Sequence, residues 1–268
     1  MHGPDRPRPL TARGDERSVT GRALAVLEAF TPERPLLSLS DLSRSAGLPL
    51  TTTHRLVAEL AAWGALERDD RGRYRIGLRL WEVASLAPRG VSLREAALPF
   101  MEDLYEVTHE NVQLAIRDGH EVVFLERIAG RRAVGVLTRV GGRFPLHATG
   151  VGLALLAHAP ADDQEELLAR PLERFTEKTL VQPDRLRRAL ADVRRTGVAV
   201  SDGQVTLDAL SVAAPVFDGA GEVVAALSIV VNSATANPAT LAPVVRAAAL
   251  GVSRSLKRRN ARHGTDTR

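Results

Sequence analysis

Cysteine is absent from this 268-residue chain, and lysine nearly so. Without cysteine the chain forms no disulfide, no thiolate metal site and no cysteine nucleophile. Lys178 and Lys257 are the two lysines, so arginine carries almost all of the positive charge. This bias is typical of a high-GC genome, and it reduces what the net charge of +4 says about partners.

Long apolar runs are also lacking. The longest strongly apolar stretch, Val223 to Val231, is too short for a bilayer, which requires about 20 apolar residues. Residues 1–17 are rich in Pro, Arg and Gly and have no apolar segment of the kind found in secretion signals. They are predicted to be a disordered basic arm. We therefore expect a cytoplasmic protein that does not contact a membrane.

The charge is unevenly distributed along the chain. Residues 1–90, 91–245 and 246–268 have net charges of +3, −5 and +6. A basic front and a basic end around an acidic middle indicate that only part of the chain faces an anionic partner. The length fits one large domain or two ordinary ones.

Residues 18–77 have the pattern of a winged helix-turn-helix domain. Apolar residues at helical spacing follow Thr20, the expected N-cap, and a second helix is expected over 40–46. Gly47 stops that helix, and Pro49 opens a third one. A hairpin follows, which completes the sequence of elements typical of this DNA-binding motif.

The third helix is predicted to bury one side and expose a polar start. Leu56, Leu60 and Trp63 recur at i, i+4 and i+7 and form the expected buried stripe. Polar residues near the N-terminal turns fall on the other side, where a recognition helix meets base edges and phosphates. These candidate DNA contacts are Thr51, Thr52, His54 and Arg55. The alternative is an ordinary capped surface helix, and the neighbouring helix and hairpin favour DNA binding.

The hairpin around residues 70–72 carries Arg71, Arg73 and Arg75, which alternation places on one face or at the tip. Arg71 and Arg73 are candidate contacts to phosphates or the minor groove. A solvated hairpin face is the alternative for each of them.

Helices and hairpins interleave in the rest of the chain. A linker helix and a Pro-Arg-Gly break are expected over 78–92, an α/β domain over 93–256, and a basic tail over 257–268. The elements expected within the domain are a helix over 93–108, a hairpin over 111–128, a strand over 134–140, an apolar helix after 147–152, a helix over 183–195, a hairpin over 211–231 and a helix over 244–256. This order predicts a mixed fold with a mostly antiparallel sheet.

Two groups of residues are candidates for binding a small molecule. His147, Thr149, Gly150 and Gly152 lie at the start of the apolar helix, where free N–H groups favour an anion. The Gly-x-Gly lacks a third glycine and does not closely follow a strand, so a dinucleotide site is not expected. Ser211 and Ser228 are polar residues on apolar strands and need partners if they point inward. The partner is either a ligand carboxylate or the neighbouring backbone.

Nothing in the sequence favours catalysis. There is no Gly-x-Ser-x-Gly nucleophile motif, and the seven histidines do not have paired metal-ligand spacing. We therefore predict no catalytic residue, no metal centre and no cofactor. The rival hypothesis is a mixed α/β enzyme with a fused DNA-binding head.

The chain resembles the IclR family of bacterial transcription regulators over about residues 18–256. The matching segments are "GRALAVLEAF", "LSLSDLSRSAGLPLTTTHRLVAELAAWGALER", "YRIGLRLWEVA", "FPLHATGVGLALLA", "DRLRRALADVRRTGVAV" and "SVAAPVFDGAGEVVAALSI". The resemblance implies an α+β fold: an N-terminal winged helix-turn-helix, a linker helix and a C-terminal effector domain with a profilin- or GAF-like sheet. It implies dimers that pair into tetramers, and a small effector, often a carboxylate or aromatic acid. It also implies that Ser201 and Asp202, on a loop, contact the effector.

The chain departs from the family pattern at several positions. Leu50 and Thr51 stand where the family usually has Lys and Ser, which implies the loss of a phosphate contact. Leu153 replaces a Lys, and an acidic pair and a later Gly correspond to Gly203, Gln204 and Asp208 here, so no effector identity is transferred. The combined prediction is a DNA-binding regulator, a repressor, whose binding to a double-stranded operator is modulated by a small organic acid.

Overall fold

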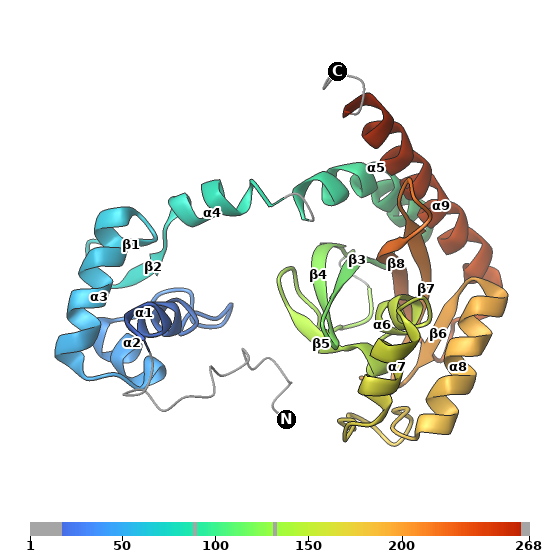
Figure 1. Ribbon diagram of the computed structural model, residues 1–268, viewed down its shortest axis with the longest axis horizontal. Coiled ribbons are helices and arrows are strands. Elements are labelled where there is room, and N and C mark those ends of the chain that lie inside the picture. Colours follow the sequence, from blue (N-terminus) through green and yellow to red (C-terminus); the bar gives the residue numbers. More distant parts are fainter. Residues whose placement is uncertain (1–17, 88–89, 131–132, 264–268) are drawn as a thin grey trace. The chain divides into compact units, whose positions relative to one another are not determined.

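A computed structural model describes residues 18–87, 90–130 and 133–263. The chain forms two compact units, one ending at Val91 and the other beginning at Ser92. Each unit is described by itself below, with the element labels of Figure 1.

The N-terminal unit is a three-helix domain with a short hairpin. Its elements are α1 (Val19–Leu27), α2 (Leu39–Ala46), α3 (Leu50–Trp63), β1 (Leu66–Arg68), β2 (Tyr74–Ile76) and α4 (Leu78–Ala84). A capping box starts α2, because Ser38 Oγ accepts from the Asp41 N–H and the Asp41 carboxylate accepts from the Ser38 N–H, both at 3.2 Å. Gly47 ends α2 with φ 67°, a left-handed conformation that lets the chain turn sharply into α3.

The core of this unit is apolar and lies between the three helices and the hairpin. Its fully buried side chains include Val26, Leu37, Leu42, Leu56, Val57 and Leu66. The winged helix-turn-helix prediction is thereby confirmed, with small differences. The N-cap of α1 is Ser18 rather than Thr20, and Pro49 is the N-cap of α3 rather than its first residue.

The prediction that Trp63 belongs to the buried stripe is wrong. Trp63 is 43% exposed, because it is the last residue of α3 and lies beyond the core around Leu56. Its ring instead forms a cation–π contact with the guanidinium of Arg79, whose Cζ lies 4.8 Å from the ring centroid. The pair links the end of α3 to α4.

The C-terminal unit is built on a six-stranded sheet in the order β5-β4-β3-β8-β7-β6, and every neighbouring pair is antiparallel. The strands are β3 (Asn111–Asp118), β4 (Glu121–Ile128), β5 (Arg143–Pro145), β6 (Ala199–Asp202), β7 (Ala209–Phe217) and β8 (Val223–Asn232). The helices are α5 (Val91–Thr108), η1 (Leu146–Ala148), α6 (Gly150–Leu156), α7 (Ala161–Leu168), α8 (Pro183–Thr196) and α9 (Pro238–His263). The predicted mixed α/β fold is confirmed.

Helices cover both faces of the sheet (Figure 1). Leu227 and Ile229 of β8 pack with α5 and α9, whereas Ala226 of the same strand packs with α6, α7 and α8. Because side chains alternate along a strand, Ser228 shares the second face with Ala226. The sheet is therefore buried on both sides, and its strands have little polar patterning.

The segment 134–140 is not a strand, contrary to the prediction. It is an irregular loop held by side chains of β3: Asn111 Nδ2 donates to the Val134 carbonyl at 2.8 Å, and Gln113 Nε2 donates to Thr138 Oγ1 at 2.6 Å. The place beside β4 is taken by β5 instead. We refer to residues 133–140 as the cover loop.

Other differences are smaller. Residues 199–202, which include Ser201 and Asp202, form edge strand β6 rather than a loop. Val107, near the end of α5, is 74% exposed. Helix α9 continues past Leu256 to His263, so part of the segment predicted as a tail is helical.

Candidate functional site

The first two turns of α3 present the predicted polar surface. Thr51, His54 and Arg55 are exposed and Thr52 is half-buried, whereas Thr53 is buried with its hydroxyl donating to the Pro49 carbonyl at 3.0 Å. Arg55 forms an ion pair with Glu59 at 3.2 Å, and both side chains are about 60% exposed. Such an exposed pair contributes little to stability and can open to meet a phosphate. The surface is therefore available to an anionic partner.

The hairpin tip is shaped by Asp69. Its carboxylate accepts from the backbone N–H groups of Arg71 and Arg73 at 3.0 and 2.8 Å and from Arg73 Nε at 3.0 Å. The hydrogen bond from the Arg73 backbone is the largest cause of the lowered pKa of Asp69. Arg73 thus stabilises the turn, while Arg71 is exposed and has no ion pair among the described residues.

Glu67 of β1 connects the hairpin to α4. It accepts from Arg75 Nε at 2.9 Å and from the Leu78 N–H, the first of α4, at 3.1 Å, which lowers the pKa of Glu67. Gly77, the N-cap, is required by close packing, because a Cβ there would lie 2.2 Å from the Gly64 carbonyl oxygen. The direction of α4 is fixed relative to the hairpin.

The C-terminal unit contains a cavity between the sheet, the start of α6 and the cover loop. It is lined by Gln113, Phe124, Val136, Leu137, Thr138, Thr149, Gly150, Val151, Ser201, Gln204, Val205, Thr206, Ala209, Ser211 and Val230. The space open to the centre of a water-sized sphere is about 60 Å³. This exceeds the roughly 10–15 Å³ that a cavity needs to admit one water, so the space can hold several atoms of a compact molecule.

Several polar groups in the lining retain hydrogen-bonding capacity. Thr149 Oγ1 accepts from the Gly152 N–H at 3.0 Å, which leaves its own hydroxyl hydrogen to donate. Ser201 Oγ donates to the Ala148 carbonyl at 3.2 Å and can still accept. Gln204 Oε1 accepts from the Leu180 N–H at 3.2 Å, so its amide nitrogen is a further donor. The lining combines hydroxyl and amide donors with apolar walls.

The cavity unites four of the eight predicted effector-binding residues. Thr149, Gly150, Ser201 and Ser211 line it, and Gly150 is needed there because a Cβ would lie 2.5 Å from Ser211 Oγ. The close approach of α6 to β7 brings these residues together.

The other four predicted residues lie outside the lining, and three of them have other roles. His147 is buried with Nε2 bonded to the Glu173 carbonyl at 2.8 Å, and burial lowers the pKa of this histidine. Asp202 is exposed and pairs with Lys178 at 3.1 Å. Gly152 packs against Leu146, where a Cβ would lie 2.2 Å from the carbonyl oxygen. These three residues support the surroundings of the cavity and do not face it.

Ser228, the fourth, is fully buried on the cavity face of the sheet, between Gln113 of β3 and Ala213 of β7. Its Oγ has no hydrogen-bond partner among the described residues, and Ser228 does not line the cavity. An unpartnered buried hydroxyl costs free energy.

Sequence reasoning missed Gln113, Thr138, Gln204 and Thr206. Gln113 stands between Val112 and Leu114 in a strand buried on both faces, and this polar break in an apolar run was the available signal. Nothing local marks Thr138, because its place depends on the course of the cover loop.

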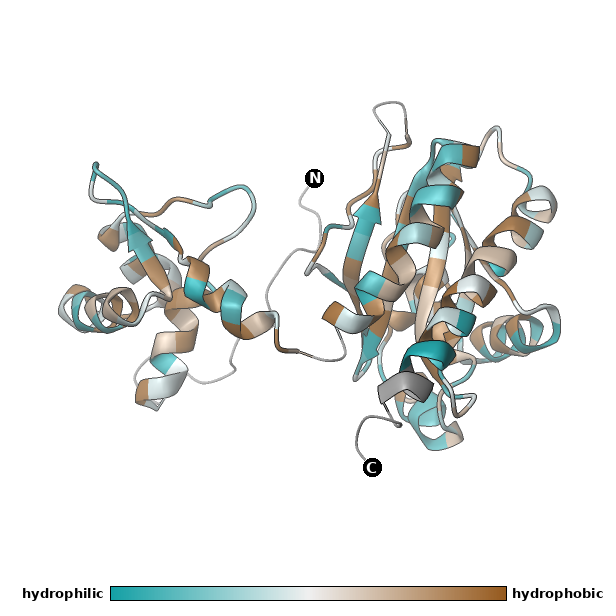
Figure 2. Cartoon of the chain, turned by 90° about the horizontal axis from the view of Figure 1, so that it is seen from above, coloured by the Kyte–Doolittle hydropathy of each residue, from teal (hydrophilic) through white to brown (hydrophobic). Residues whose placement is uncertain are grey.

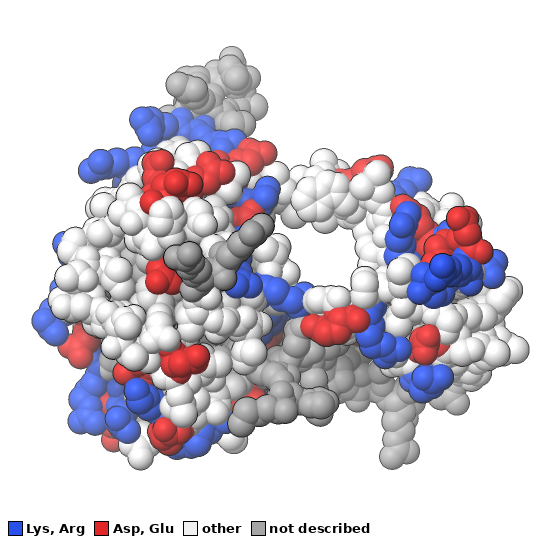
Figure 3. Space-filling model, turned by 180° about the vertical axis from the view of Figure 1, so that it is seen from behind, with Lys and Arg blue, Asp and Glu red and all other residues white. Residues whose placement is uncertain are grey.

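Among the residues that the structure describes, none that lines the cavity has an ionisable side chain. On the face of the molecule in Figure 3, acidic and basic side chains are interspersed over the C-terminal unit rather than gathered in one field. The lining therefore offers hydrogen-bonding groups and apolar contact, with no acid or base among its described residues.

Both units match models of known protein families. The model described as bacterial transcriptional regulator IclR C-terminal matches residues 87–254, and that of the IclR helix-turn-helix domain matches residues 19–70. The chain belongs to the IclR family. It is a DNA-binding transcription regulator of the IclR type.

Curated IclR-family relatives cover most of the chain. The transcriptional repressor IclR of Escherichia coli is 32% identical over 222 residues, which are 81% of each chain. The regulator XynR of the same species is 31% identical over 240 residues, covering 88% of this chain and 95% of its own. Among solved structures, an IclR homologue from Microbacterium hydrocarbonoxydans in complex with 4-hydroxybenzoate has a TM-score of 0.85 and 40% identity, covering 90% of this chain and 99% of that one.

Proposed function

We propose that this IclR-type regulator reads its operator with the start of α3 and the hairpin tip, and that a small organic acid bound in the cavity modulates this binding. Thr51, Thr52, His54 and Arg55 supply the base and phosphate contacts, and Arg71 contacts the backbone or minor groove. Arg73 holds the hairpin tip in shape for that contact. Repression is the expected mode, since relatives such as IclR of E. coli are repressors.

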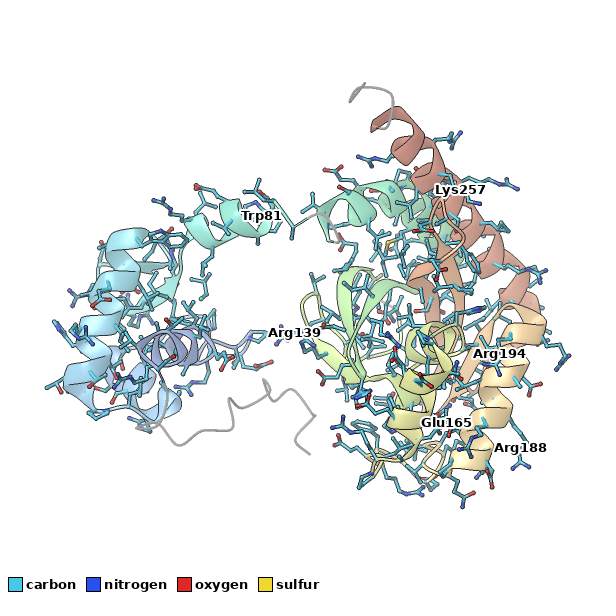
Figure 4. All side chains as sticks on the ribbon, viewed as in Figure 1. Trp81, Arg139, Glu165, Arg188, Arg194 and Lys257 are labelled. Carbon is cyan, nitrogen blue, oxygen red and sulfur yellow. The ribbon has the colours of Figure 1, made fainter. Side chains whose placement is uncertain are left out.

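Alanine substitution of α3 tests the DNA-reading surface. An operator is first selected from random duplex DNA with the parent protein. Arg55→Ala and Thr52→Ala should each weaken binding by about 1–3 kcal/mol, roughly 5- to 150-fold, because each removes a base or phosphate contact. Arg188→Ala, an exposed arginine on α8 (Figure 4), removes the same charge outside this surface and should leave the affinity within about twofold. Unchanged affinity in both α3 variants would refute the assignment.

The cavity supports an acidic effector of modest size. Its polar lining is made of hydroxyl and amide groups that can donate to a carboxylate, and Phe124, Val136 and Val151 provide an apolar wall. The Microbacterium homologue, at 40% identity, was solved with 4-hydroxybenzoate, a monocyclic acid. We infer that the effector of this chain is a monocyclic or similarly compact carboxylic acid.

Ser211 is the position that tests the cavity. Its side chain lines the space and meets the start of α6. A thermal-shift screen of small carboxylates identifies a binder, since a ligand that prefers the native state raises stability. Ser211→Ala should weaken binding of that acid by about fivefold or more, as expected for a lost hydrogen bond of about 1 kcal/mol or more. Asp202→Ala, an exposed change on the adjoining strand, is the control and should bind as the parent does; equal binding by all three proteins would locate the effector elsewhere.

Homo-oligomerisation is supported by α4, which buries none of its residues within its own chain. Leu78 and Trp81 are each 63% exposed and Val83 is 51% exposed, and hydrophobic residues are visible along α4 in Figure 2. An exposed apolar surface of this kind marks an interaction site. We assign it to a second copy of the chain.

The rival enzyme hypothesis finds no support at the cavity. General acid–base chemistry requires a titratable group within hydrogen-bond reach of the reacting atom, and the polar residues that line the cavity are Ser, Thr and Gln.

None of the helices in the described part of the chain is long and apolar enough to cross a membrane.

A further inference from the structure

Arg127 lies on β4 beside the cavity and directly opposite Gln113 in the sheet. Its Nη1 donates to the Thr138 carbonyl at 3.2 Å, and its Nε and Nη2 donate to Asn111 Oδ1 at 3.2 and 2.8 Å. Both Gln113 and Thr138 line the cavity. The guanidinium is therefore one residue removed from the cavity, on the same face of the sheet.

The charge of Arg127 is not neutralised by a carboxylate among the described residues. Its neighbour Glu126 forms an ion pair with Arg94 of α5 at 2.5 Å. Asp118 and Glu121 both form ion pairs with Arg143. Arg127 has neutral oxygens as its side-chain acceptors, and burial lowers the pKa of its guanidinium. A half-buried cation without a counter-ion is costly, and a nearby anion would relieve that cost.

No lining residue can supply this charge complementarity. Gln113, Thr138, Gln204 and the hydroxyl groups are neutral, so they bind an acid and its amide with similar hydrogen bonds. Within a poorly solvated site a single charge acts over a longer distance than it does in water. Arg127 donates directly to the carbonyl of lining residue Thr138, so its charge acts on a ligand in the cavity.

We propose that Arg127 is a specificity-determining residue whose positive charge selects an anionic effector over a neutral molecule of the same shape. This proposal rests on the effector function assigned above. Arg127 acts through Thr138 and Gln113, so it is a positioning and electrostatic residue that does not line the site. It also fastens the cover loop together with Asn111, whose Nδ2 holds the Val134 carbonyl, and the test must separate the two roles.

Binding of acid–amide pairs to the full chain distinguishes charge recognition from loop fastening. The probes are 4-hydroxybenzoate, benzoate and lactate, each with its own amide, measured by isothermal titration calorimetry. The parent should prefer at least one acid over its amide by tenfold or more. In Arg127→Met that preference should fall to about twofold or less through loss of acid binding, with the amide affected by less than about threefold. Arg127→Lys, which keeps the charge, should retain most of the preference.

The outcomes separate the two proposals. If the parent binds neither member of any pair, the effector function itself fails, and this inference fails with it. If the parent binds an acid but Arg127→Met weakens acid and amide equally, Arg127 only fastens the cover loop and the charge role is overturned. An unchanged acid preference in Arg127→Met overturns it as well. Thermal unfolding of each variant without a probe confirms that the comparison is made on folded protein.

Discussion

Single buried polar residues show how this chain combines a closed core with a ligand-sized cavity. Ser211, Thr149 and Ser201 face the cavity, whereas His147, adjacent in sequence to the same helix start, points to the Glu173 carbonyl. His147 and Thr149 are two residues apart, but His147 lies in η1 and Thr149 is the N-cap of α6, so their side chains project in different directions. Residue type alone therefore could not separate cavity residues from supporting ones.

His147 gives a testable dependence of stability on pH. Burial lowers the pKa of His147 below its usual value of 6.5, so the folded state binds its proton less readily than the unfolded state. Its contribution to stability is complete above about pH 6.5 and is lost as the pH falls below that value. In His147→Gln, whose amide can still donate to Glu173, the free energy of unfolding from urea titrations should fall less between pH 7 and pH 5 than it does in the parent.

The exposed residue His54 provides the control for this experiment. His54→Gln should keep the parent's pH dependence, because the change does not touch the buried site. If His147→Gln also retains that dependence, another group such as the half-buried His158, whose pKa is likewise lowered by burial, causes the loss of stability at low pH.

At the scale of elements, glycines that end helices were the reliable signals in this chain. Gly47 ends α2 as predicted, and Gly64 and Gly197 end α3 and α8 in the same left-handed conformation, because this capping acts within a few residues. The hairpins predicted over 111–128 and 211–231 also have local turns, in which Gly119 and Gly221 adopt positive φ.

Two segments whose structure depends on distant partners, 134–140 and 199–202, were not predicted correctly from the sequence. The valines of 134–140 alternate as in a strand, yet the segment is held by side chains more than twenty residues away. Asn111 donates to the Val134 carbonyl, and Gln113 donates to the Thr138 hydroxyl. Strand β6 is only four residues long and exists because β7 pairs with it. The cavity was therefore predictable at the start of α6 and on β7, but not at the cover loop.

At the scale of the whole molecule, the proposed dimer would place two DNA-binding domains on one operator. A helix-turn-helix dimer contacts two half-sites, and its affinity exceeds that of one domain because the second contact is intramolecular. Helix α4 is fixed to its own DNA-binding domain by Glu67 and exposes Leu78 and Trp81. Trp81 is labelled in Figure 4. A dimer formed through α4 would therefore hold the DNA-binding domains at a defined spacing.

Trp81→Glu should disrupt that dimer, because it places a charge in the apolar surface of α4. Light scattering coupled to size-exclusion chromatography should show a lower mass than the parent, and operator affinity should fall by tenfold or more. The salt dependence provides a second measurement, since log affinity falls with log salt at about 0.9 per phosphate neutralised. A single DNA-binding domain neutralises half as many phosphates as two, so the slope should be about half that of the parent.

The control is Val107→Glu, which introduces the same charge at a 74% exposed position on α5. It should leave the mass, the operator affinity and the salt slope unchanged. If Trp81→Glu keeps the mass and slope of the parent, the copies associate through another surface and α4 serves only as a connection between the units.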